Sequence, residues 1–183
     1  MIQNEVTRNI TARYSCRDFD SRQIPDEVLE TIIESGKYAA NGRNAQAWHF
    51  TVVRTEEGKR LAVAALGKEP PAGFPPDMKW PHDADFHGAP VLVIISCDPA
   101  VPYPNVGCIL AAGNMMLTAT SLGLATVWSS AFTKDMFRDE ESLKFKPKLM
   151  PENYEVYAAV FIGYPAKQPA PRPARKEGVV TYI

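Results

Sequence analysis

Two arginines and a serine alternate along one short segment of the chain, as Arg13, Ser15 and Arg17. In an extended segment alternate residues point to one side, so these three side chains could converge on a single ligand. Arginine offers a planar fork of N–H donors that matches a phosphate or a conjugated carbonyl edge, and serine adds a short hydroxyl donor. The spacing therefore suits a phosphorylated cofactor, although the same pattern also occurs on solvated surface strands.

The sequence gives little support for a metal centre, a catalytic nucleophile or a phosphate-binding loop. His82, Asp83, Asp85 and His87 cluster in a proline-rich stretch but lack the spacing of a helical metal motif, so we predict no metal site. The chain contains neither a Gly-x-Ser-x-Gly nucleophile setting nor a glycine-rich phosphate loop. An enzyme without its own nucleophile, metal or general-base pair needs an organic cofactor.

Length and composition indicate one domain over residues 1–183, because domains commonly hold about 100–200 residues. The hydrophobic share of 45% and the charged share of 22% are ordinary for a globular protein. A net charge of −1 gives no electrostatic reason to expect nucleic acid or anionic lipid as a partner. We therefore expect a small-molecule ligand.

The cysteines, the N-terminus and one long uncharged stretch indicate the cellular compartment in which we expect the protein. Cys16, Cys97 and Cys108 show no CxxC spacing and leave an odd count, which favours reduced thiols in the cytoplasm. The N-terminus shows no signal-peptide pattern. Residues 106–128 carry no charge, but the polar residues and glycines among them favour a buried helix followed by a buried strand over a membrane span.

Hydrophobic periodicity predicts an alternation of helices and strands that would position the polar residues. We expect helices over 4–12, 26–36, 56–65, 105–122 and 133–144, strands over 48–53, 90–97, 124–129 and 154–164, and a long proline-rich loop over 70–90. This order predicts an α+β or α/β sandwich. The helix over 105–122 is apolar all round, so we expect it to pack against a second subunit.

The end of the chain reads as an extended arm over residues 164–183. It combines prolines, the basic residues Arg172, Arg175 and Lys176, and a final strand-like run over 179–183. A proline-rich arm followed by a strand suggests an extension that crosses to another subunit.

Four segments together resemble the FMN-dependent nitroreductase family, in order from about residue 8 to residue 183. They are Arg13-x-Ser15-x-Arg17-x-Phe19, Asn44-x-Gln46-x-Trp48, the run from Asn114 through Leu122-Gly123-Leu124 to Trp128, and Gly163-Tyr164-Pro165 with its basic tail. The resemblance implies a three-layer α+β sandwich with a mostly antiparallel central sheet flanked by helices, and a homodimer that exchanges its C-terminal arms. It also implies FMN at the subunit interface and a ping-pong reaction in which NAD(P)H reduces the flavin before a nitroaromatic, quinone or similar flat acceptor oxidises it.

The resemblance also assigns roles to residues. Arg13, Tyr14 and Ser15 would hold the phosphate and ribityl end of FMN, helped by Arg172, Arg175 or Lys176, and Arg17 would lie near the N1/C2 edge of the ring as the catalytic residue. Asn41, Gly42, Asn44 and Gln46 would meet the flavin from the partner subunit, and Ser129, Ser130 and Ala131 would offer backbone N–H groups to its N5 side.

The sequence leaves alternatives open. The same scaffold supports reductive dehalogenation, fragmentation of the flavin itself, or flavin binding without catalysis. The stretch over 70–86, with Phe74 and Trp80, is either a wall of the substrate slot or a plain surface loop anchored in the core.

Overall fold

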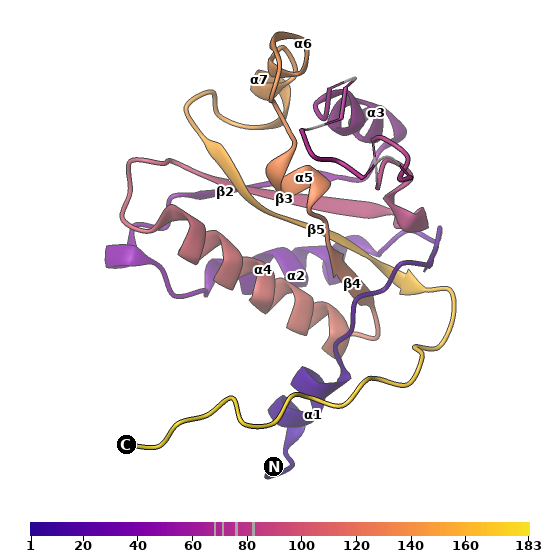
Figure 1. The fold of residues 1–183 in the computed structure, drawn as a ribbon, viewed down its shortest axis with the longest axis vertical. Coiled ribbons are helices and arrows are strands. Elements are labelled where there is room, and N and C mark those ends of the chain that lie inside the picture. The colour runs from indigo at the N-terminus through magenta and orange to yellow at the C-terminus, as the bar shows by residue number, and fades with distance from the viewer. Residues whose placement is uncertain (68, 71, 76, 82) are drawn as a thin grey trace.

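The protein is a layered α+β structure with a five-stranded sheet in the middle (Figure 1). The computed structural model describes residues 1–67, 69–70, 72–75, 77–81 and 83–183. The strands are β1 (Phe19–Asp20), β2 (Trp48–Val53), β3 (Val91–Cys97), β4 (Ala125–Trp128) and β5 (Glu155–Pro165). Every pair of named strands is antiparallel, in the order β1-β5-β3-β2, and β4 also pairs with β5.

Helices cover both faces of the sheet (Figure 1). On one face lie α2 (Asp26–Lys37) and α4 (Pro104–Ser121), with α1 (Glu5–Ala12) packed on α4; on the other lie α3 (Glu56–Ala64), α5 (Ala131–Lys134), α6 (Glu140–Leu143) and α7 (Lys146–Leu149). Short 3-10 turns form at η1 (Gly42–Asn44) and η2 (Phe86–Gly88). The predicted fold class is confirmed, and four of the five expected helices and the four strands expected before the C-terminal arm form within a few residues of their predicted bounds.

Strand β3 shows why the sheet needs two helical layers. All seven of its residues are buried. Val91, Val93 and Ile95 face the cluster under α2 and α4, whereas Leu92 and Ile94 face the cluster under α3 and α5. A strand that is apolar on both sides must be covered on both sides, so the sheet divides the core into two.

Helix α4 is only partly covered in the single chain. Its inner side is buried through Cys108, Ala112 and Met115. Its outer side leaves Val106 and Ile109 each 45% exposed. This open apolar side is consistent with the expectation that α4 packs against a second subunit.

The prediction of one helix over residues 133–144 is wrong. Two short helices, α5 and α6, replace it, and α7 follows them. Phe137 adopts a left-handed conformation with φ of 61°, which ends any continuous helix. The Asp139 side chain then accepts a hydrogen bond from the Ser142 backbone N–H and begins α6 with a capping box.

The strand expected over residues 179–183 is also not formed. Residues 166–183 carry no regular secondary structure, and Tyr182 is 93% exposed. A strand needs a neighbouring edge for its backbone hydrogen bonds, and no strand in the described part of the chain pairs with this segment. The arm instead runs past α1 (Figure 1).

Among the described residues, none of the helices has both the length and the apolar character needed to span a membrane.

The cap of α6 makes stability depend on pH. Hydrogen bonds from the Ser142 backbone N–H and side chain lower the pKa of the Asp139 carboxyl. A lowered pKa stabilises the fold above the ordinary carboxyl pKa, and this contribution is lost as the pH falls through the lowered value. We expect Asp139→Ala to lower the melting temperature near neutral pH, and we expect its difference from the wild type to shrink as the pH falls below the ordinary carboxyl pKa. Thermal unfolding over this range measures the effect; Asp139→Asn, which keeps an acceptor, is the control, and a pH-independent difference for Asp139→Ala would contradict the argument.

Candidate functional site

The segment from Arg13 to Arg17 is extended and borders the sheet. Helix α1 ends at Ala12, Arg13 has φ of −60° and ψ of 133°, and Ser15 forms a parallel bridge with Thr126 of β4. Cys16 is buried in the core, whereas Ser15 and Arg17 are exposed. Ser15 and Arg17 thus lie exposed on either side of the buried Cys16, as an alternating segment requires, whereas Arg13 and Tyr14 are both half-buried.

Three guanidinium groups gather at the start of this segment. Arg172 of the tail donates to the carbonyl oxygens of Thr11 and Ala12, which end α1. Burial, and then the positive charges of Arg172 and Arg175, lower the pKa of the Arg13 guanidinium. Like charges this close repel each other unless an anion lies between them, so the cluster is suited to a phosphate.

The tail and the Arg13–Arg17 segment form the two walls of a groove. Its volume is about 370 Å³, and it is lined by residues 14–18 on one side and 167–173 on the other. An ion pair of 2.6 Å between Lys167 and Asp18 holds the walls together. Tyr14 lines the groove, but its ring also packs against the core, and burial raises the pKa of its hydroxyl.

The tail cations differ in their placement. Arg172 and Arg175 both act on the pKa of Arg13, and Lys176 is not among the charges that shift it. Sequence reasoning selected Arg172 without foreseeing its bond to α1. One feature of the sequence could have indicated this bond. The last turn of α1 has no basic residue of its own, so its carbonyl dipoles lack a compensating positive charge within the helix.

The corner after β4 presents backbone donors. The Ser129 N–H donates to the Ala159 carbonyl at 2.9 Å, so the sheet already uses it. Ser130 is exposed and directly precedes α5, which begins at Ala131. N–H groups at a helix start have no intrahelical partner. Ala131 is fully buried, so the exposed Ser130 is the residue of the predicted trio whose N–H a ligand can reach.

Sequence reasoning missed the side-chain contact of Ser129. Its Oγ donates to the Asp83 carboxylate at 2.9 Å, which connects β4 to the proline-rich stretch. Asp83 and His87 drew attention only as poor metal ligands, and no local pattern pairs either of them with a serine some 40 residues away. The described residues hold no cluster of three or more metal-ligating side chains, and His82 lies outside them.

The segment from Asn41 to Gln46 lies elsewhere. The Asn41 side chain accepts from the Gln46 N–H at 2.9 Å and shapes its own turn. A Cβ at Gly42 would lie 2.4 Å from the Pro102 carbonyl oxygen, so only glycine fits this close approach. Asn44 and Gln46 are exposed.

This second segment lies at the opposite end of α4 from the arginine cluster. Asn41 packs against Gly107 near the start of the helix. Asn9 of α1 donates to the Leu117 carbonyl near its end. Ten residues of helix separate these contacts by about 15 Å. The chain thus brings together Arg13, Ser15, Arg172 and Arg175, but not Asn44 and Gln46.

The protein's own thiols are unsuited to nucleophilic chemistry. Cys97 and Cys108 are buried, and burial raises the pKa of both thiols. A buried, protonated thiol is inert because the thiolate is the nucleophile. This agrees with the expectation of chemistry supplied by a cofactor.

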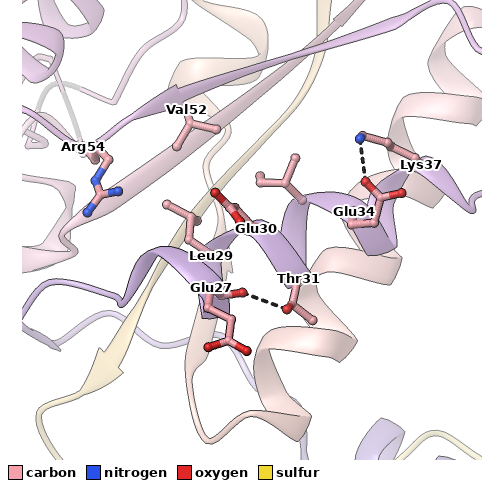
Figure 2. A pocket seen from close by; sticks show the side chains of 9 residues that line it. Glu27, Leu29, Glu30, Thr31, Glu34, Lys37, Val52 and Arg54 are labelled. Atoms are coloured by element: carbon pink, nitrogen blue, oxygen red, sulfur yellow. Dashed lines mark hydrogen bonds and ion pairs between the residues drawn. The ribbon is translucent and has the colours of Figure 1, made fainter.

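A larger cavity of about 850 Å³ lies between α2 and the edge strand β2 (Figure 2). Leu29, Ile33 and Val52 supply its apolar surface, and Glu34 and Lys37 pair at its rim. None of the predicted site residues lines it. Size alone therefore does not identify the site, and the arginine groove remains the better candidate.

Comparison with known proteins gives the family. A model of the nitroreductase family matches residues 10–164. The chain belongs to the nitroreductase family. A nitroreductase from Bacteroides fragilis, solved with bound FMN, has the same fold with a TM-score of 0.82 and 32% identity, over 99% of this chain and 100% of that one.

Two curated relatives extend the comparison. A protein of Archaeoglobus fulgidus, provisionally named an NADH dehydrogenase/NAD(P)H nitroreductase, is 31% identical over 170 residues, which cover 88% of this chain and 86% of the relative. An iodotyrosine deiodinase from Thermotoga neapolitana is 27% identical over 182 residues, which cover 93% of each chain. Along nearly its whole length the chain therefore resembles proteins with two different names, a nitroreductase and an iodotyrosine deiodinase.

The arginine cluster predicts binding of a simple anion. Because a ligand of the native state stabilises it, millimolar inorganic phosphate should raise the melting temperature of the ligand-stripped protein. Arg13→Ala should abolish the increase. Arg54→Ala is the matched control, since Arg54 pairs with Asp26 beside the other cavity. An equal rise in Arg13→Ala and wild type, with ionic strength held constant by chloride, would disprove an anion site at Arg13.

Proposed function

We propose that this nitroreductase binds FMN in the groove between the Arg13–Arg17 segment and the tail. There it would use NAD(P)H to reduce flat acceptors such as nitroaromatics or quinones by a ping-pong mechanism. The observation that carries the proposal is the convergence of Arg13, Arg172 and Arg175 beside Ser15, in a chain whose fold matches a nitroreductase solved with FMN. FMN, when bound, accepts two electrons from NAD(P)H and passes them to the acceptor.

The residues present fit the two ends of FMN. The arginine cluster and the Ser15 hydroxyl supply donors and positive charge for a phosphate. Ser130 supplies a backbone N–H group at the β4–α5 corner, which follows the strand that Ser15 touches. The donor set thus combines a cluster of cations for the phosphate with a backbone N–H group for the ring.

Arg17 is the residue we assign to ring chemistry. It is exposed on the same side of the extended segment as Ser15 and lines the groove. Reduction of the flavin leaves negative charge near the N1/C2 edge of its ring. A fixed guanidinium stabilises such charge more strongly in a poorly hydrated site than in water.

A homodimer would complete the site. The two segments expected to contact FMN lie at opposite ends of α4 in one chain, so Asn44 and Gln46 would reach the flavin of the other subunit. The open apolar side of α4, with Val106, Ile109 and Leu110, offers a surface for such a partner. Residues 176–183, beyond the two tail arginines that lie near Arg13, would form the exchanged part of the arm.

Reductive dehalogenation is the second candidate. The similarity to an iodotyrosine deiodinase covers 93% of this chain, which favours it as an alternative on the same scaffold. Release of iodide from 3-iodotyrosine under anaerobic conditions, at a rate above that of quinone reduction, would assign the protein to this activity instead.

The proposal predicts a yellow protein of twice the chain mass. Under anaerobic conditions NADH or NADPH should bleach its flavin absorbance, and a quinone or nitroaromatic added afterwards should restore it. Stopped-flow absorbance measures the two halves separately, and light scattering measures the mass. A colourless protein that takes up no added FMN would rule out every flavin-based function.

Arg17→Ala should slow flavin reduction by NAD(P)H and lower the flavin midpoint potential, because the charge that stabilises the reduced ring is removed. The fold should persist, since the side chain is exposed. Arg54→Ala again serves as a control outside the groove. Unchanged reduction kinetics and potential would remove Arg17 from the mechanism.

A further inference from the structure

The segment from Asp83 to Gly88 lies between the two parts of the proposed flavin site. On one side, a Cβ at Gly88 would lie 2.9 Å from the carbonyl oxygen of Phe19, which follows Arg17 in the same extended stretch. On the other side, Asp83 accepts from the Ser129 hydroxyl at the β4–α5 corner. The segment therefore contacts both the strand that carries Arg17 and the corner that carries Ser130.

The backbone of this segment is strained. Asp83, Phe86 and His87 have φ of 60°, 56° and 52°, a left-handed conformation that residues other than glycine rarely adopt. Such conformations persist where the surroundings over-determine them, and they cluster at functional sites. Here Phe86 is 2% exposed and meets the ring of Phe132 edge-on at 5.4 Å, so the core fixes the middle of the segment.

Asp83 is the polar anchor of the segment. One carboxylate oxygen lies 2.9 Å from Ser129 Oγ, and the other lies 3.0 Å from His87 Nε2. Ser129 Oγ in turn accepts from the backbone N–H of Phe132 at 3.3 Å in the first turn of α5. Because the serine hydroxyl hydrogen is committed to Asp83, its lone pairs face the helix, and the Ser129 rotamer is fixed.

We propose that Asp83 and Gly88 are positioning residues of the flavin site. Asp83, through Ser129, sets the orientation of the Ser130 N–H group, and Gly88 allows the close contact with Phe19 that sets the distance from this corner to the extended Arg13–Arg17 segment. The inference rests on the proposed function. Neither residue needs to touch FMN, since each acts through a neighbour.

The negative charge of Asp83 should also affect how easily the flavin is reduced. A carboxylate held beside the β4–α5 corner opposes the build-up of negative charge on a nearby ring. Removing the charge while keeping the shape should therefore make the flavin easier to reduce, whereas a residue that only tethered a loop would leave the potential unchanged.

The test of Asp83 compares Asp83→Asn, Asp83→Ala and Asp85→Asn. Asp85 is the matched control, because among the described residues its side chain accepts a hydrogen bond only within its own turn, from the His87 N–H at 3.1 Å. Fluorescence titration of the FMN-free protein should show weaker FMN binding in Asp83→Ala, by about tenfold, as for other residues that orient a site's ligands. Asp83→Asn should raise the flavin midpoint potential, and Asp85→Asn should match the wild type in both measurements.

The test of Gly88 compares Gly88→Ala with Gly73→Ala. Both glycines have positive φ, of 82° and 79°, so both variants suffer the same kind of backbone strain. Only at Gly88 would the new methyl group meet a backbone atom, because nothing lies within 4 Å of a Cβ at Gly73. Gly88→Ala should weaken FMN binding, and Gly73→Ala should not.

A measurement without flavin separates this inference from the proposed function. Hydrogen exchange of the peptide containing Ser130 and Ala131 in the FMN-free protein should be faster in Asp83→Ala than in Asp85→Asn. If the wild type binds no FMN, the proposed function fails. If it binds FMN but Asp83→Ala and Asp83→Asn match Asp85→Asn in affinity, potential and exchange, the positioning role is overturned.

Discussion

The burial of both sheet faces is the constraint on which the rest of the structure depends. Strand β3 has no polar side facing water, so helices must cover the sheet from both sides, and side chains that need solvent or a ligand cannot lie on its faces. Polar groups are displaced to the rims, where strands end and helices begin. The Arg13–Arg17 segment and the corner after β4 occupy one such rim, and the turn containing Asn44 occupies another.

The elements that follow from hydrophobic periodicity could be predicted from the sequence. Helix α2 and strands β2 and β3 appear where the pattern places them, because burial of an apolar stripe or run decides them locally. Elements decided by single residues could not be predicted as well. The positive φ of Phe137 interrupts a pattern that reads as one helix, and β1 is too short to have a periodicity at all.

The same distinction applies to the candidate site. Arg13, Ser15 and Arg17 could be grouped because two-residue spacing has a direct meaning in an extended segment. The bond between Ser129 and Asp83 joins residues 46 positions apart, and no spacing rule covers such a pair. Nor could the sequence show that the Asn44 turn and the arginine cluster lie at opposite ends of one helix, because that separation comes from how α1 and η1 pack against α4.

The contact of Arg172 with the end of α1 has a consequence for a truncated chain. The sheet is complete once β5 has formed, whereas one wall of the groove comes from the stretch that follows it. The layered core can therefore form without the anion-binding groove. A chain truncated just after β5 would keep an intact interior and only one of the two walls of the groove.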